Sequence, residues 1–374
     1  MNEKPFQVAI LHAFSRKNAG DGLLIDLTYD ALEEAGVERD RIAILALDPN
    51  SVSDVANVFS APGEPTARPT WRLANAALEL VADFAGSGTV RRVAAQSHAL
   101  VAVGGGYLVT DSPVRQTGVL LNHLAQLRVA AAHAGPTVYL PQSIGPLSGV
   151  VGGLARKKLS QVGRVWARDE TTLTELALPN VRRCPDLAVM KLAQTYKGTR
   201  QQQQTTGSPL LVARDLPAAG EYVARLQNLN RLVPHARWAV QADVPGPRSD
   251  RSFYRRLGWA DAGALSNLLG EPGGPVVSVR LHGAIAALIA GRPAIHLAYE
   301  RKGWGAYEDL GLSEWVHDAR RFDPGVVASQ LNALITDSCR FWACIERAQN
   351  RIVNSRADMI EDLRLRIFSD TPGQ

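Results

Sequence analysis

Three cationic side chains follow two apolar runs in the second half of the chain. Arg280 and His282 come directly after residues 276–279, and Lys302 follows residues 294–298. Both runs are typical of buried parallel strands, and ligands of open α/β sheets bind beyond the carboxyl ends of such strands. A guanidinium, an imidazole and an ammonium group beside a helix N-terminus together favour a phosphate or carboxylate ligand. Any one of the three alone would rather indicate a surface turn with solvated charges.

A candidate carboxylate lies near the start of the chain. Residues 7–14 are expected to form the first strand, and the Gly-containing loop 15–22 leads from it into an amphipathic helix. The loop has neither the G-x-G-x-x-G nor the Walker A pattern, so it predicts no nucleotide site. Asp21 fits both the N-cap of this helix and a catalytic carboxylate at a strand end. Asn18 is expected to form a turn.

Three consecutive glycines follow the apolar residues 99–103. Gly104, Gly105 and Gly106 would let backbone amides approach a ligand closely. A tight turn with positive φ is the alternative, but such a turn requires one glycine rather than three. We therefore expect a ligand-facing loop at this position.

Two further strand ends carry polar side chains. Gln142 and Ser143 follow the expected strand at residues 137–140, where they could donate or accept hydrogen bonds. Arg168 follows the expected strand at residues 164–167 and is a second candidate ligand for an anion. An ion pair with one of the two acidic residues that come directly after Arg168 is the favoured alternative.

The order of the expected elements predicts two α/β domains. Strands alternate with helices in both halves, and residues 196–209 (YKGTRQQQQTTGSP) have the composition of a linker. We expect two doubly wound, Rossmann-like domains that face each other across a cleft. Their ranges would be 1–195 and 210–323, followed by a C-terminal helical tail at 324–374.

Hydrophobic periodicity predicts several individual elements. It indicates one helix over 114–134, a second over 261–269 and a nearly continuous helix over 324–368. Residues 48–69 are expected to form a long loop with a short helix near 52–59, and residues 71–85 have helical periodicity.

Composition restricts the class of protein. The chain has 374 residues and a net charge of +5, which fits an anionic substrate or an anionic membrane face. It has no Lys/Arg-rich run and no basic stripe interleaved with aromatic residues, so we expect no nucleic-acid partner. Its three cysteines include no C-x-x-C pair. Neither a signal peptide nor a membrane-length apolar stretch is visible, and the expected location is the cytoplasm.

Six short segments occur in an order that resembles the polysaccharide pyruvyl transferase family. Each segment alone is a weak signal, but their order over residues 8–312 makes the match specific. The segments are 18–21 (NAGD), Gly104–Gly106 with Asp111, 141–146 (PQSIGP), 167–170 (ARDE), 185–188 (PDLA), and 280–302, which begins with RLHG, contains GRP and ends with Tyr299 and Lys302.

The resemblance implies a fold similar to the GT-B glycosyltransferases, with the acceptor on the N-terminal domain and phosphoenolpyruvate on the C-terminal domain. The implied reaction moves the enolpyruvyl group of phosphoenolpyruvate onto two hydroxyls of a sugar, forming a pyruvate ketal and phosphate. His282 would then be the general acid, Asp21 the base, Lys302 the cation at the leaving phosphate and Arg280 a donor ligand. The other residues expected to contact substrate are Leu281, Arg168, Asn18, Gly104, Gly105, Gly106, Gln142 and Ser143.

The implied partners are phosphoenolpyruvate and a sugar acceptor, with no metal or other cofactor. A lipid-linked acceptor would add peripheral contact with the inner membrane face. The acceptor sugar and the oligomeric state stay open. One alternative is a GT-B glycosyltransferase with a nucleotide-sugar donor. Another is a non-catalytic protein that binds a glycan or an anion.

Overall fold

The computed structural model describes residues 5–62, 78, 81–82, 88–198, 207–216, 220–243 and 249–368. The chain divides into two compact units. Unit 1 consists of Met1–Arg16, Leu24–Leu187 and Ser355–Gln374, and unit 2 consists of Lys17–Leu23 and Ala188–Asn354.

Unit 1 contains a seven-stranded sheet in the order β3-β2-β1-β4-β5-β6-β7. All of its pairings are parallel. The strand order reverses beside β1, which is the doubly wound arrangement. The strands are β1 (Phe6–Ala13), β2 (Ile42–Ala46), β3 (Asn57–Ser60), β4 (Ser97–Ala102), β5 (Thr137–Gln142), β6 (Arg164–Ala167) and β7 (Val181–Arg183).

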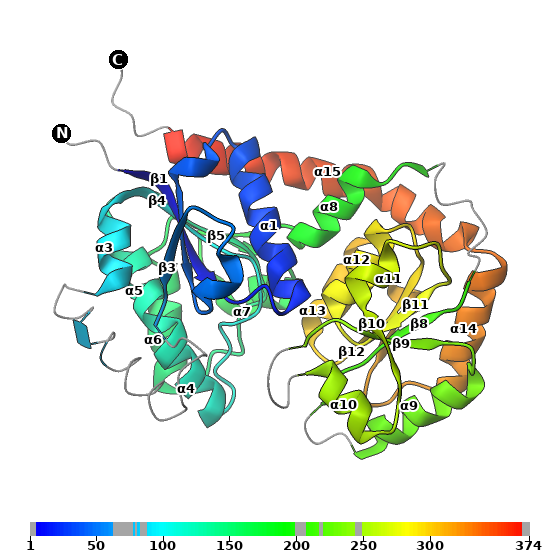
Figure 1. Ribbon diagram of the computed structural model, residues 1–374. Helices are drawn as coiled ribbons and strands as arrows, with labels where there is room; N and C mark the ends of the chain where they lie inside the picture. Colours follow the sequence, from blue (N-terminus) through cyan, green and yellow to red (C-terminus); the bar gives the residue numbers. More distant parts are fainter. Residues whose placement is uncertain are drawn as a thin grey trace. The chain divides into compact units, whose positions relative to one another are not determined.

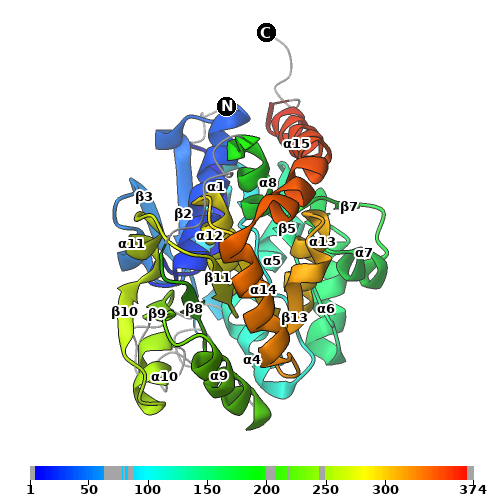
Figure 2. The same cartoon turned by 90° about the vertical axis from the view of Figure 1, so that its right-hand side faces the viewer.

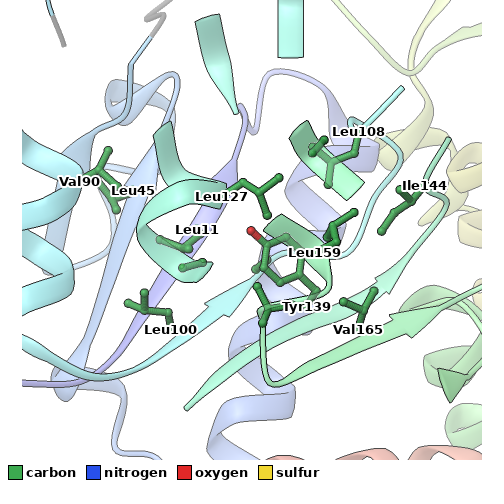
Figure 3. Close-up of a cluster of buried hydrophobic side chains, with 14 of the residues drawn as sticks. Leu11, Leu45, Val90, Leu100, Leu108, Leu127, Tyr139, Ile144, Leu159 and Val165 are labelled. Carbon is green, nitrogen blue, oxygen red and sulfur yellow. The ribbon is translucent and has the colours of Figure 1, made fainter. Parts of the chain in front are cut away.

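Helices cover both faces of this sheet, because its central strands are apolar on both faces (Figure 1). Leu11 and Leu100 point to the same face as Tyr139, where Leu127 packs against them (Figure 3). The helices of unit 1 include most of α1 (Ala19–Glu34), α3 (Thr89–Ala95), α4 (Pro113–Asn122), α5 (Leu124–Ala132), α6 (Gly149–Leu159) and α7 (Glu170–Leu176).

Unit 2 contains a six-stranded sheet in the order β10-β9-β8-β11-β12-β13, again with parallel pairings. Its strands are β8 (Leu210–Val212), β9 (Arg237–Val240), β10 (Asp261–Ala264), β11 (Val276–Ser278), β12 (Ala294–Ala298) and β13 (Val316–Asp318). Helices α9 (Gly220–Leu232) and α14 (Pro324–Thr336) pack side by side against each other (Figure 2). The other helices are α8 (Leu187–Thr195), α10 (Asp250–Arg256), α11 (Leu265–Leu269), α12 (Leu281–Ile289), α13 (Arg301–Asp309) and the first part of α15 (Cys339–Phe368).

Three expected helices differ from the structure. The helix expected over 114–134 is divided into α4 and α5 at His123, whose backbone leaves helical geometry with φ −124°. Residues 261–264 form the edge strand β10 rather than helix, and Gly263 there has φ +108°. The long C-terminal helix is divided into α14 and α15. Asp337 ends the first of these as its C-cap, and its side chain accepts the amide of Cys339, the first residue of the second, at 2.8 Å.

The segment expected as a loop over 48–69 contains two regular elements. Residues Pro49–Val52 form a 3₁₀ helix, and β3 adds an edge strand to the sheet. Residues 63–69 lie outside the described part of the chain. The helix expected over 71–85 does too, apart from residues 78 and 81–82.

The units do not follow the expected domain ranges at three places. Helix α8 belongs almost entirely to unit 2, where Gln349 of α15 donates to the carbonyls of Ala193 and Tyr196. The end of α15 belongs to unit 1, where Asp362 binds Arg164 in an ion pair. Residues 17–23 belong to unit 2. Most of the expected linker, residues 199–206, lies outside the described residues.

Within the described ranges, none of the helices combines the length and the apolar character that a membrane span requires.

Candidate active site

Two successive helices of unit 2 begin at the same edge of its sheet. Strands β11 and β12 are paired in parallel, with Ser278 opposite His296, and α12 and α13 follow them. His282 is the second residue of α12, and Lys302 is the second residue of α13. Neither N-cap residue uses its side chain to cap its helix. The amides of both first turns therefore add positive potential beside an imidazole and an ammonium group.

The first turn of α1 belongs to the same unit. Asn18 forms an isolated β-bridge with Ala242, which follows β9. Its side-chain oxygen accepts the Gly20 amide at 3.2 Å, and its side-chain nitrogen donates to Asp21 at 2.8 Å. The N-cap interpretation of Asp21 was therefore wrong. Asn18 caps α1, and Asp21 is the third residue of the helix.

The carboxylate of Asp21 lies within electrostatic reach of the three expected cations. Burial raises the pKa of Asp21 above its usual value. His282, the Asn18 amide, Lys302 and Arg280 each oppose that rise. A carboxylate whose pKa is raised is a stronger proton acceptor than an exposed one, so the arrangement suits a general base.

Arg280 lies in a buried ion pair that sequence reasoning missed. Its Nε lies 3.0 Å from both carboxylate oxygens of Asp250, and its Nη2 also donates to this carboxylate. Asp250 accepts the backbone amides of Gln241 and Ala242 as well, at 3.1 and 2.9 Å. Arg280 thus connects the start of α12 to the start of α10, in addition to any contact with a ligand. Burial raises the pKa of Asp250, and the guanidinium opposes that rise.

A second histidine lies beside the two cations. His296 is buried in β12, where its Nδ1 donates to the Ser278 carbonyl at 2.8 Å. The pKa of His296 is lowered to about 4, chiefly by burial and to a smaller extent by the charges of Lys302 and His282. The ring is therefore neutral at physiological pH. Lys302 itself lies 2.7 Å from Glu300, and both side chains are partly exposed.

The glycine loop of unit 1 extends the pairing of β4 with β5. The Gly105 amide donates to Pro141, and the Gly105 carbonyl accepts the Ser143 amide at 2.8 Å. A Cβ at Gly104 would lie 2.8 Å from the Pro141 carbonyl oxygen. Close approach of two strands thus accounts for Gly104, and the backbone polar groups of Gly105 are used within the fold. Gly106 is exposed, and Leu281 is a buried residue in the first turn of α12.

Arg168 and Ser143 form a buried network at the ends of β5 and β6. The Arg168 guanidinium donates to the Ser143 hydroxyl at 2.9 Å and pairs with Asp186. Ser143 donates in turn to Asp169, which caps α7. The favoured alternative for Arg168, an ion pair, is therefore correct, but its partner is Asp186 rather than an adjacent acid. The exposed Glu170 pairs with Arg183 instead.

Gln142 belongs to a separate polar cluster beneath the glycine loop. Its amide nitrogen donates to the Tyr107 hydroxyl at 2.8 Å. His12 contacts the Tyr139 hydroxyl through Nε2 at 3.0 Å and His123 through Nδ1 at 3.2 Å. His12 has φ +62° at an irregularity in β1, and its amide donates to Gln126. Burial lowers the pKa of both histidines, that of His123 to about 4.

Metal coordination has no evident site in the described part of the chain, because no three His, Cys, Asp or Glu side chains gather there with suitable geometry. The polar groups at the edge of unit 2 are instead suited to binding an anion and to moving protons.

Comparison with known proteins gives one family and one fold. The sequence profile of the family "Polysaccharide pyruvyl transferase" matches residues 18–254. The amylovoran biosynthesis protein AmsJ of Erwinia amylovora is 29% identical over 91 residues, which cover 23% of this chain and 22% of AmsJ. This curated relative is thus matched over less than a quarter of its length.

Solved structures share the fold of the whole chain at low sequence identity. The S. aureus MnaA complex with UDP has a TM-score of 0.55 at 10% identity, with 98% of each chain covered. Anabaena Alr3699/HepE, solved in complex with UDP and glucose, has a TM-score of 0.55 at 13% identity, with 96% of this chain and 99% of that chain covered. The expected GT-B-like, Rossmann-like architecture, which these neighbours share, is confirmed.

The profile includes Asn18, Asp21 and Asp250, whereas α12 and α13 lie beyond it. It covers more than half of the chain and identifies a transferase of polysaccharide biosynthesis. The chain belongs to the polysaccharide pyruvyl transferase family.

Proposed function

We propose that this enzyme transfers the enolpyruvyl group of phosphoenolpyruvate to two hydroxyls of a sugar, in a polysaccharide or in its lipid-linked precursor. The observation that carries the proposal is the meeting of Asp21 with His282 and Lys302 in unit 2. One carboxylate, one imidazole and one ammonium group are the charges that the reaction requires. The family membership supports the same reaction.

Phosphoenolpyruvate would bind at the first turns of α12 and α13. It carries a carboxylate and a phosphate, and both anions are stabilised by helix N-termini and by cations. Lys302 supplies a point charge for the phosphate, and its pairing with Glu300 is partly exposed and can rearrange. The charge of Arg280 is largely balanced by Asp250, so Arg280 serves mainly to hold the start of α12.

The protons balance with one acid and one base. His282 delivers a proton to the methylene carbon of phosphoenolpyruvate, which makes C2 electrophilic, and Asp21 takes the proton of the first attacking hydroxyl. The second hydroxyl then replaces the phosphate at C2, and the C–O bond to phosphate breaks. The sugar gives up two hydroxyl protons in all. One makes up for the proton that was added to the methylene carbon to form the methyl group, and the other leaves with hydrogen phosphate.

Calorimetric titration with phosphoenolpyruvate, UDP and inorganic phosphate tests the donor. We expect phosphoenolpyruvate to bind more tightly than phosphate, and we expect Lys302→Met to weaken that binding. Phosphate release in the presence of candidate acceptor oligosaccharides then tests turnover. Tight binding of UDP without binding of phosphoenolpyruvate would overturn the proposal.

That outcome would favour a glycosyltransferase with a nucleotide-sugar donor. The observation behind this second candidate is the shared fold with MnaA and Alr3699/HepE, both of which were solved with UDP.

A further inference from the structure

Gln241 comes directly after β9 and packs against the first turns of two helices. A Cβ on Gly20, in the first turn of α1, would lie 3.2 Å from Gln241 Nε2 and 3.0 Å from His282 Nδ1. A Cβ on Gly283, in the first turn of α12, would lie 2.1 Å from Gln241 Oε1. The amide of Gln241 therefore occupies space that two glycines leave open, and it lies beside the imidazole of His282.

The main chain holds Gln241 in this place from two sides. The backbone amides of Gln241 and Ala242 donate to the buried carboxylate of Asp250. Ala242 also forms the β-bridge with Asn18. Asp250 also binds Arg280, which is the N-cap of α12. The backbone of Gln241 and the start of α12 are therefore attached to the same carboxylate. A shift of Gln241 would therefore disturb the helix that carries His282.

The amide group of the Gln241 side chain is buried, and one of its polar atoms makes no hydrogen bond to the described residues. Gln241 is 8% exposed, and its Oε1 is buried and lacks a hydrogen-bond partner among the described residues. Packing alone would be met by an apolar side chain of the same size, such as methionine, which leaves no polar atom unsatisfied. The amide is thus better explained by its dipole, whose oxygen faces the first turn of α12 and whose nitrogen faces Gly20 and His282.

We infer that Gln241 is a positioning residue for His282, and that its amide fixes the ring of the general acid against the first turns of α1 and α12. The inference rests on the proposed function for the role of His282, but the proximity of both side chains to Gly20 does not. The charged and titratable groups around this imidazole include Asp21 of α1 and His296 of β12, and Lys302 of α13 and Arg280 share these surroundings.

Titration of His282 by NMR tests the contact without any substrate. The full chain is labelled at histidine, and the His282 resonance is assigned with a His282→Gln variant. Gln241→Glu places a carboxylate beside the ring, and we expect it to raise the pKa of His282 by about one unit or more. Gln241→Met keeps the size of the side chain and removes the dipole, and we expect it to change the chemical shift of His282. The matched control is Gln349→Met, in α15 of the same unit, which should leave the His282 signal unchanged.

A His282 titration in Gln241→Glu that coincides with wild type, in a protein of unchanged melting temperature, would overturn the inference. If Gln241→Glu does not fold, an unchanged His282 signal in Gln241→Met would overturn it equally. Activity adds a second readout, in which Gln241→Met lowers kcat about tenfold with little change in KM for phosphoenolpyruvate. A wild-type enzyme without turnover would contradict the proposed function and leave the NMR result standing.

Discussion

His282 and Lys302 occupy the same position in two successive helices. Each is the second residue after an N-cap, and the strands that precede α12 and α13 pair directly in one sheet. The two side chains therefore start from neighbouring points at the carboxyl edge of the sheet, where both helix dipoles favour an anion. Asp21 adds a carboxylate whose pKa both His282 and Lys302 influence.

The two equivalent positions should have different effects when they are changed. Lys302→Met removes a point charge, and we expect the Kd for phosphoenolpyruvate to rise about tenfold to a hundredfold. His282→Gln removes the proposed proton donor, and we expect kcat to fall about 10²-fold to 10⁴-fold with a smaller change in Kd. Calorimetry and phosphate release measure the two effects. Lys157→Met, at an exposed position of α6 in unit 1, controls for net charge. Equal effects of both variants on Kd would contradict the division of roles.

Asp21, the proposed base, should lower the stability of the folded protein at neutral pH. Because burial raises its folded-state pKa, the folded protein binds a proton there more tightly than the unfolded chain does. The stability contribution is therefore largest below the unfolded pKa, and it falls as the pH rises through the folded pKa. At pH 7 we expect Asp21→Asn to stabilise the protein by roughly 1 kcal/mol for each unit of that rise, and to abolish turnover. Urea unfolding of both proteins at pH 7 and pH 4 measures the difference. A loss of stability at pH 7 would show that the carboxylate is stabilising instead.

The pair Asp250–Arg280 should show strong coupling. Asp250 is fully buried and Arg280 nearly so, so removal of one partner leaves an uncompensated charge in the interior. We expect Asp250→Asn and Arg280→Met each to reduce the free energy of unfolding by about 3 to 5 kcal/mol. The double variant should lose much less than the sum. The exposed i,i+4 pair Asp111–Arg115 is the control, with an expected coupling below about 1 kcal/mol. Additive losses at Asp250 and Arg280 would show that the pair does not act as a unit.

Local sequence was sufficient for most strands but not for the edges of the sheets. The strands at 164–167 and 294–298 are found at the predicted residues, because each is a short apolar run bounded by polar residues. The edge strands β3 and β10 were missed. NVFS and DAGA show neither a continuous apolar run nor a clear alternation, and none of the side chains of β3 is fully buried.

Local sequence also predicted only part of the candidate site. Strand-end position identified His282 and Lys302, since their place depends only on the strand before them. The partners that hold the site, such as Asp250 and Gln241, lie about 30 to 40 residues away from Arg280 and Gly283, and no local pattern connects them. For Arg168, closeness in the sequence suggested the wrong partner. The adjacent acids looked like its partners, but Asp169 caps α7 and accepts from Ser143, and Asp186 pairs with the guanidinium.

Gly283 should be intolerant of a methyl group because of Gln241. Alanine usually stabilises a helix relative to glycine by about 1 kcal/mol. At Gly283, however, the new Cβ would lie 2.1 Å from Gln241 Oε1, and we expect Gly283→Ala to destabilise the protein by about 1 to 3 kcal/mol. Adding Gln241→Ala should restore most of this loss, although Ser278 Oγ at 2.9 Å limits the recovery.

The matched control for this helix position is Gly118→Ala. Gly118 lies inside α4, and nothing lies within 4 Å of the position that its Cβ would take. This substitution should stabilise the protein by a few tenths of a kcal/mol to about 1 kcal/mol. Thermal and urea unfolding of these three variants and of the wild type give the comparison. If Gln241→Ala failed to relieve Gly283→Ala at all, the close contact between the two residues would be refuted.

The histidine cluster of unit 1 should make the protein sensitive to mild acid. Burial lowers the pKa of His12 and His123, that of His123 to about 4, so the unfolded chain binds protons there more tightly than the folded unit. Stability is therefore fully present above about pH 6.5, the ordinary pKa of histidine, and it falls as the pH drops toward 4. We expect each of the two histidines to account for a loss of up to about 2 kcal/mol between pH 7 and pH 5. His123→Gln, followed by urea unfolding across this range, should flatten the slope, whereas the exposed His235→Gln should not. An unchanged slope in His123→Gln would mean that the cluster accommodates the proton, with Tyr139 or Gln126 rearranging around it.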